Sequence, residues 1–149
     1  MESETHKSQR VVVSNCLSLY FWVTVLGYIL ADEGYDVWMG NNRGNTFSRE
    51  HKKYSVLEED YWKFSWHEVG CSDLPAMIDY ILIKTNKTEL IYTGHSQGTT
   101  DFWVMATERP EYQRKIKAMF ALGPVAYLDH IKSLFYRIVA QFSNNLEVR

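Results

Sequence analysis

The sequence predicts an α/β fold in which a parallel sheet is flanked by helices. Segments with helical spacing alternate three times with short strand-like runs rich in β-branched and aromatic residues. Clusters of Gly, Asn and Pro separate these segments as turns. No internal repeat or low-complexity linker divides the 149 residues, which suffice for one packed domain. Because helical crossovers return the chain in the same direction, this order favours parallel strands.

The first predicted helix and strand lie before residue 40. Leu26, Ile29 and Leu30 fall on one helical face, and Gly34 follows as a helix stop. Residues 35–38 (YDVW) have the composition of a short strand. The Gly-Asn-Asn-Arg-Gly sequence after them is typical of a turn.

The second predicted helix follows a long loop. Residues 47–70 are aromatic and charged without a steady period, so we expect a loop with short helical turns. Ser72 is the expected N-cap, and Pro75 suits the first turn. Residues 85–89 are expected to be a loop. The apolar face of this helix comprises Leu74, Met77, Ile78, Ile81 and Leu82.

The remaining elements are a strand at residues 90–93, a helix at 97–107 and a strand at Ile116–Leu122. Arg109 and Pro110 end the helix between them. We expect the three predicted strands to pair in parallel. The strand at 90–93 should lie between the other two unless an inserted strand intervenes.

The apolar run at residues 11–31 admits three interpretations. Its length suits a membrane span of about 20 residues or the core of a signal peptide. Two early glutamates offset Lys7 and Arg10, so the leading segment lacks the positive charge of a clear signal peptide. Because Leu26 and its neighbours belong to the first helix, we expect this end to pack on the sheet, and a membrane span is disfavoured.

A Gly-x-Ser-x-Gly turn, Gly94-His95-Ser96-Gln97-Gly98, joins the second predicted strand to the third helix. A serine on such a sharp, strained turn has its hydroxyl lifted above the sheet edge, and the glycines remove side chains where strand and helix cross closely. The N–H of Gln97 then points toward a developing oxyanion, helped by the positive end of the following helix. The pattern predicts a positive φ at Ser96 and a role as nucleophile.

Seven stretches are specific to one family. They are residues 31–38 (ADEGYDVW), 40–46 (GNNRGNT), 64–68 (FSWHE), 73–80 (DLPAMIDY), 94–100 (GHSQGTT), 109–112 (RPEY) and 124–127 (PVAY). On these residues the chain resembles the acid lipase family, which includes gastric and lysosomal acid lipases. The resemblance implies an incomplete copy of an α/β-hydrolase fold. Residues 1–25 are then an unmatched leader, and residues 26–149 are the central part of a lipase domain.

The resemblance also implies a function. It is the hydrolysis of lipid esters, of the triacylglycerol or cholesteryl ester type, by serine nucleophilic catalysis in a secreted or lysosomal protein. Ser96 matches the nucleophile of the family, and Gln97 matches the donor of one oxyanion N–H. The expected partner is a lipid ester substrate. The family's acid and base lie on strands beyond Arg149, and its second oxyanion donor lies in a His-Gly-Leu-type loop that has no counterpart here.

No histidine of the chain is favoured as the catalytic base. A hydrolase of this kind needs a serine, then an acid, then a histidine in chain order. Only His130 follows the serine at a distance, and its neighbour Asp129 is badly placed to orient it. A surface or hinge histidine is the favoured interpretation. We therefore expect this chain alone to hydrolyse esters poorly or not at all.

Net charge, cysteine spacing and short motifs bear on partners, cofactors and modification. The net charge of −2 and the lack of a basic run exclude nucleic acid as a partner. Cys16 and Cys71 match no metal spacing, so no metal is expected, and no phosphate loop or dinucleotide fingerprint predicts a cofactor. Asn86-Lys87-Thr88 is an N-glycosylation sequon in a predicted loop. Two alternative functions stay open, a non-catalytic lipase remnant that binds lipid and a membrane-anchored protein using residues 11–31.

Overall fold

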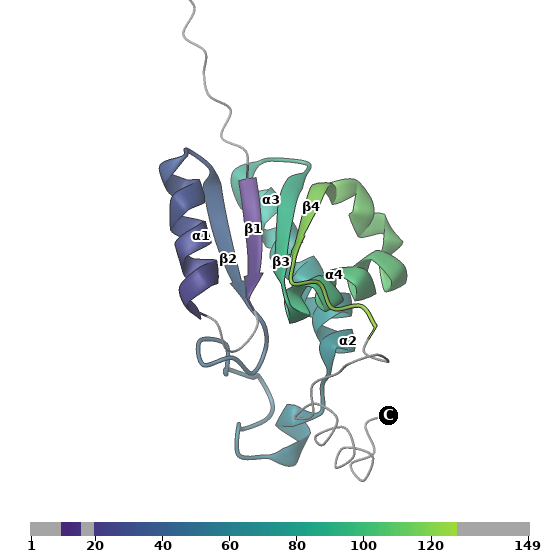
Figure 1. Cartoon of the computed structure of the whole chain (residues 1–149). Helices are drawn as coiled ribbons and strands as arrows, with labels where there is room; N and C mark the ends of the chain where they lie inside the picture. Colours follow the sequence, from purple (N-terminus) through teal and green to yellow (C-terminus); the bar gives the residue numbers. More distant parts are fainter. Residues whose placement is uncertain (1–9, 16–19, 128–149) are drawn as a thin grey trace, which may run out of the picture.

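A computed structural model describes the backbone of residues 10–15 and 20–127, with side chains from Val25 onward. Its centre is a four-stranded sheet of order β2-β1-β3-β4 in which all pairs are parallel (Figure 1). The predicted parallel pairing is therefore confirmed, with an inserted strand between the first two of the three predicted strands. The strands are β1 (Arg10–Asn15), β2 (Asp36–Asn41), β3 (Leu90–His95) and β4 (Ile116–Leu122).

The inserted strand β1 is the one described strand that is not expected from the sequence. Val11 pairs with Val37 of β2 on one side and with Ile91 of β3 on the other. Consecutive valines favour a strand because β-branched side chains suit a pleated surface. Here the valines lie at the start of a long apolar run that continues into α1 (Tyr20–Asp32). The pattern of apolar residues therefore does not show where the strand ends and the helix begins. The segment expected to be an unmatched leader thus contributes a strand to the sheet.

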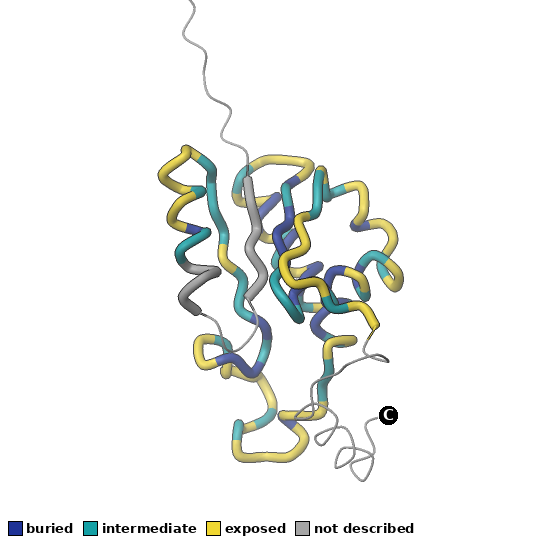
Figure 2. The backbone as a smooth tube through the Cα atoms, in the orientation of Figure 1, coloured by how far each residue is buried: buried dark blue, intermediate teal, exposed yellow. Residues whose placement is uncertain are grey.

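Helices cover both faces of the sheet. Along β3, Leu90 and Tyr92 belong to a core shared with α3 and α4, whereas Ile91 packs with Leu30 of α1. Because successive strand residues point to opposite faces, α1 lies on one face and α3 and α4 lie on the other. Figure 2 shows buried residues along β3 and the helices beside it. These helices are α1 (Tyr20–Asp32), α3 (Leu74–Thr85) and α4 (Gln97–Glu108).

The helical region before α3 begins earlier than predicted. A short helix α2 (Trp66–Glu68) continues through a π-helical segment η2 (Val69–Asp73) into α3. Its cap is Ser65, whose hydroxyl accepts from the backbone N–H of His67 while the Glu68 carboxylate accepts from the backbone N–H of Ser65. The prediction that Ser72 is the N-cap is wrong, because the Ser-x-x-Glu capping box lies one helical segment upstream.

The connections are short except for residues 42–65. That loop contains one 3-10 turn, η1 (Glu59–Trp62), which agrees with the short helical turns expected there. Helix α3 ends at Asn86 in the left-handed conformation, with φ 50°. A second 3-10 segment, η3 (Pro110–Lys115), leads from α4 into β4. No helix in the described part of the chain has both the length and the apolar character needed to cross a bilayer.

Candidate active site at the Ser96 turn

Ser96 is the single residue between the end of β3 and the start of α4. Its backbone has φ 51° and ψ −116°, a conformation that costs an ordinary L-residue about 1–3 kcal/mol. Among the described residues, only Asn86 is another non-glycine residue with positive φ. The predicted strained strand–turn–helix is therefore confirmed, and Ser96 stands at the carboxyl end of a parallel strand.

Glycine is required on the strand side of the turn. A Cβ atom at Gly94 would lie 2.8 Å from the carbonyl carbon of Gly98 and 2.9 Å from the ring of Tyr92. Tyr92 is fully buried, and its hydroxyl donates a hydrogen bond to the Gly98 carbonyl oxygen at 2.7 Å. The start of α4 is thus held directly against the last residues of β3, which leaves no space for a side chain at Gly94.

The segment after β4 also fastens the turn. The N–H of Ser96 donates to the carbonyl oxygen of Leu122 at 2.9 Å. The N–H of Val125 donates to the Thr99 hydroxyl oxygen at 2.8 Å, and the Thr100 hydroxyl donates to the carbonyl oxygen of Val125 at 2.8 Å. These bonds join Ser96 and the first turn of α4 to the end of β4 and the residues after it, so the position of Ser96 is determined from several directions.

The backbone around Ser96 is suited to a negative charge. Gln97 is the first residue of α4, so its N–H belongs to the helix end that carries the positive part of the helix dipole. His95, the residue before Ser96, is half-buried. The elbow residues Gly94, His95 and Gly98 therefore lie where the sequence predicts them, around a serine next to a helix N-terminus.

No base is assigned to Ser96 among the described side chains. The Ser96 hydroxyl has no hydrogen bond to a histidine or a carboxylate in the described residues. The ring of His51 accepts from the backbone N–H groups of Lys53 and Tyr54 in the long loop, and the ring of His67 lies 3.7 Å from the Cys71 sulfur. His130 lies outside the described residues.

The loop after β2 joins the elbow helix through a contact that no pattern in the sequence predicts. The Asn42 side-chain amide donates to Asp101 Oδ2 on α4 at 2.9 Å. Asp101 is fully buried, and burial raises the pKa of its carboxyl group to about 7. Its Oδ1 atom has no hydrogen-bond partner in the described residues. The two residues stand 59 positions apart, so no local pattern in the sequence indicates the pair.

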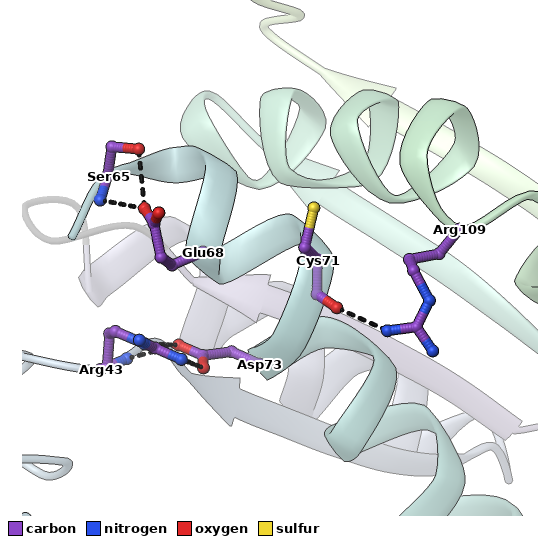
Figure 3. A network of polar contacts seen from close by, with 6 residues as sticks. All are labelled: Arg43, Ser65, Glu68, Cys71, Asp73 and Arg109. Atoms are coloured by element: carbon purple, nitrogen blue, oxygen red, sulfur yellow. Dashed lines mark hydrogen bonds and ion pairs between the residues drawn. The ribbon is translucent and has the colours of Figure 1, made fainter. Parts of the chain in front are cut away.

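A second contact anchors the same loop to η2. Arg43 Nε donates to both carboxylate oxygens of Asp73 at 2.9 Å (Figure 3). The hydrogen bond to Asp73 raises the pKa of Arg43, so the guanidinium remains charged. The loop is therefore tied to α4 by Asn42 and to η2 by Arg43, both beside the carboxyl edge of the sheet.

The neighbouring cysteine does not supply an alternative nucleophile. Cys71 lies in η2, where its carbonyl oxygen accepts from Arg109 Nη1 at 3.0 Å (Figure 3). Burial raises the pKa of the Cys71 thiol, which disfavours the reactive thiolate. In residues 10–15 and 20–127, no group of three or more His, Cys, Asp or Glu residues is placed to hold a metal ion.

An apolar groove of about 370 Å³ lies on the α1 face of the sheet, between α1 and β4. Its wall includes Leu122, whose carbonyl oxygen accepts the hydrogen bond from Ser96. Phe120, another wall residue, is 55% exposed. The groove is lined by Leu26, Leu30, Tyr35, Ile91, Thr93, Phe120 and Leu122.

Comparisons with known proteins agree with this geometry. A family model described as alpha/beta hydrolase fold matches residues 14–148. A solved structure titled as a predicted CIB-like hydrolase from Thermoplasma acidophilum has a TM-score of 0.53 at 15% identity, over 89% of this chain and 58% of that one. A putative alpha/beta hydrolase from Agrobacterium tumefaciens has a TM-score of 0.52 at 16% identity, over 88% and 56%. At these identities the structural likeness concerns the fold alone.

Sequence relatives are more similar. Lipase 3 of Drosophila melanogaster is 55% identical over 115 residues, which are 77% of this chain and 29% of that protein. Human lysosomal acid lipase/cholesteryl ester hydrolase is 53% identical over 110 residues, which are 70% of this chain and 28% of that protein. The chain therefore spans less than a third of the length of these relatives.

Proposed function

Because this chain belongs to the alpha/beta hydrolase fold family, we propose that it is part of a carboxylic ester hydrolase that cleaves lipid esters with Ser96 as nucleophile. The observation that carries this proposal is the strained backbone of Ser96, at φ 51° between β3 and the N-terminus of α4. The fold class predicted from the sequence and the resemblance to acid lipases are both confirmed.

The relatives and the groove support the proposed substrate class. One relative is named a lysosomal acid lipase/cholesteryl ester hydrolase, and others are named lipases. We infer that this chain takes part in cleaving triacylglycerols or cholesteryl esters. The apolar groove beside Leu122 offers a surface for an acyl chain next to the serine turn. We also propose a secreted or lysosomal location, which the relative named a lysosomal acid lipase supports.

The proposed reaction needs a nucleophile, a base and an oxyanion site. The Ser96 oxygen attacks the ester carbonyl carbon while its proton passes to a base, and the carbonyl oxygen becomes an oxyanion. The N–H of Gln97 and the positive end of α4 stabilise that charge. The alcohol leaves with the proton, and water then releases the fatty acid and restores the Ser96 hydroxyl. No described residue fills the role of base or acid.

This chain by itself is therefore expected to turn over esters poorly. Loss of a triad member lowers the rate of serine hydrolases by about 10⁴- to 10⁶-fold. The apolar groove also supports a second candidate function. In that alternative the chain binds a lipid ester without cleaving it.

The test compares the purified chain with Ser96→Ala, using Ser55→Ala as a matched control because Ser55 is exposed in the long loop. We measure release of p-nitrophenol from a short-chain ester and covalent labelling by a fluorophosphonate. Labelling that is lost in Ser96→Ala and kept in Ser55→Ala supports Ser96 as nucleophile. Equal labelling of all three proteins would contradict that role, and binding of a fluorescent cholesteryl ester without labelling would favour the alternative.

Glycosylation at Asn86 is part of the same proposal. Asn86 and Thr88 are exposed in the turn between α3 and β3. Asn86 precedes the start of β3, and Ser96 follows its end. A glycan at Asn86 would therefore lie at the amino ends of the strands, opposite the serine. Expression through a secretory pathway should give a product whose mass falls after glycosidase treatment. Asn86→Gln should abolish the difference, and an unchanged mass in the wild type would argue against modification.

A further inference from the structure

Asp101 is the one described side chain with a fully buried polar atom and no hydrogen-bond partner for it. The side chain lies in the first turns of α4 with no exposed surface. An unpartnered carboxylate oxygen in a protein interior is costly, and it persists where the group performs a task that apolar packing cannot. Asp101 contributes nothing to the reaction as derived above, so its role is unexplained.

The contacts of Asp101 point to the serine turn. One oxygen accepts from Asn42 Nδ2, and the Gln97 side chain also forms a hydrogen bond with the Asp101 carboxyl group. Gln97 is the residue directly after Ser96, and Asn42 belongs to the loop at the same edge of the sheet. Asp101 thus connects the start of the elbow helix with the loop after β2.

We propose that Asp101 is a positioning residue of the serine turn, which holds the Gln97 side chain and the Asn42 amide together and thereby fixes the direction of the Gln97 N–H. The inference rests on the proposed function, since the direction of that N–H matters only if an oxyanion forms at Ser96. It goes beyond the triad and the oxyanion hole, because Asp101 acts through Gln97 and does not touch the reacting atoms.

The charge on Asp101 determines how strongly it holds these partners. Burial raises the pKa of the carboxyl group, the hydrogen bonds from Asn42 and Gln97 lower it, and the nearby Asp73 carboxylate raises it further. Asp73 is the charged group that faces Asp101 from η2, and it is paired with Arg43. Glu68 of α2 and Arg109, which precedes η3, have other hydrogen-bond partners.

Ionisation should therefore tighten the turn. A carboxylate accepts stronger hydrogen bonds from the amides than a neutral carboxyl group does. With its pKa at about 7, Asp101 changes its charge near neutral pH. Above that pH the Asn42 and Gln97 amides are held by a charged acceptor, and below it by a neutral one.

The experiment is a pH titration of the isotopically labelled 149-residue chain by NMR. The carboxyl carbon of Asp101, the side-chain amide of Asn42 and the backbone amide of Gln97 should all shift with a common midpoint near pH 7. Asp101→Asn should abolish the shifts of both amides. Glu108→Gln, which changes an exposed acid on the same helix, should leave them in place.

A further variant tests the direction of the coupling. Because the hydrogen bond from Asn42 lowers the pKa of Asp101, Asn42→Ala should move the carboxyl midpoint to higher pH. A carboxyl signal that titrates near the ordinary value of 3.8, or a Gln97 amide that ignores the Asp101 titration, would overturn the inference. These signals require only wild-type protein, so a variant that fails to fold leaves the test intact.

The outcome is independent of esterase activity. If the three signals share a midpoint but fluorophosphonate labels Ser96→Ala and the wild type equally, the proposed function is refuted and the coupling is retained. Labelling that depends on Ser96 without a common midpoint would retain the proposed function and refute the coupling.

Discussion

Tyr92 donates a hydrogen bond from its hydroxyl to the carbonyl oxygen of Gly98, at 2.7 Å, across the base of the serine turn. The ring is fully buried and stacks against Phe102 of α4, with ring centroids 5.2 Å apart. One side chain of β3 therefore holds the first two turns of the elbow helix by a polar contact and an apolar one. The strained residue Ser96 lies in the chain between Tyr92 and the helical residues that Tyr92 contacts.

Tyr92→Phe should weaken this attachment without leaving a cavity. Loss of a typical buried hydrogen bond costs about 1 kcal/mol of unfolding free energy. We expect a decrease of that size in urea unfolding. Tyr80→Phe is the control, because Tyr80 is 55% exposed on α3 and should unfold as the wild type does. Equal loss in both variants would show that the bond to Gly98 is unimportant.

Gly94→Ala tests the close approach of β3 and α4. The added methyl group would meet the Gly98 backbone at 2.8 Å, and backbone atoms cannot move aside as a flexible side chain does. Overpacking of this kind costs about 3 kcal/mol. Gly34→Ala is a useful comparison. Gly34 has φ 85° with no atom within 4 Å of the added Cβ, so only the backbone cost of about 1–2 kcal/mol applies.

The two variants separate steric overlap from backbone strain. In thermal unfolding, the midpoint temperature of Gly94→Ala should be well below that of Gly34→Ala. The reverse order would mean that the helix and strand separate easily at the serine turn.

The caps of the α2–α3 region give a third prediction. Ser65→Ala removes the capping box and should lower the unfolding free energy by about 1 kcal/mol. Ser72 lies inside η2 and is exposed, so Ser72→Ala should change the unfolding free energy by less than about 0.5 kcal/mol. Chemical denaturation of the two variants measures both values. A larger loss of stability in Ser72→Ala than in Ser65→Ala would mean that Ser72 is the cap, as expected from the sequence.

Asp101→Asn should change how stability depends on pH. The folded chain keeps the Asp101 proton up to about pH 7, whereas the unfolded chain releases it near 3.8. Between these values the folded state binds more protons, so the unfolding free energy falls as pH rises, by at most about 1.4 kcal/mol per pH unit. Relative to Asp101→Asn, the wild type should lose stability from pH 5 to pH 7. Parallel pH profiles from urea unfolding would contradict this.

The sequence predicted what depends on local patterns. The strand Ile116–Leu122 has the predicted bounds, and Ser96 has the predicted positive φ, because both follow from short runs of residues. β1 was missed because its valines merge with the apolar helix that follows. The cap expected at Ser72 is wrong, since Ser65 and Glu68 form a capping box upstream.

Contacts over long distances could not be predicted in this way. The bond between Asn42 and Asp101 depends on where the loop after β2 lies against α4, and no periodicity in either segment carries that information. A buried acid on a helix that begins at the serine is visible in the sequence only as one polar residue near Phe102. Its burial and its unpartnered oxygen emerge from the packing of η2, α4 and the loop.

The central position of β1 also determines how the chain reaches its native state. β1 pairs with β2 and with β3, and Val11 meets Ile91 about 80 positions later in the chain. During synthesis at about 5–20 residues per second, β1 leaves the ribosome at least several seconds before β3 can pair with it. Sheet formation therefore depends on contacts of high sequence separation, which slow folding. Until β3 arrives, one edge of β1 is open to other chains, and aggregation competes with folding at that stage.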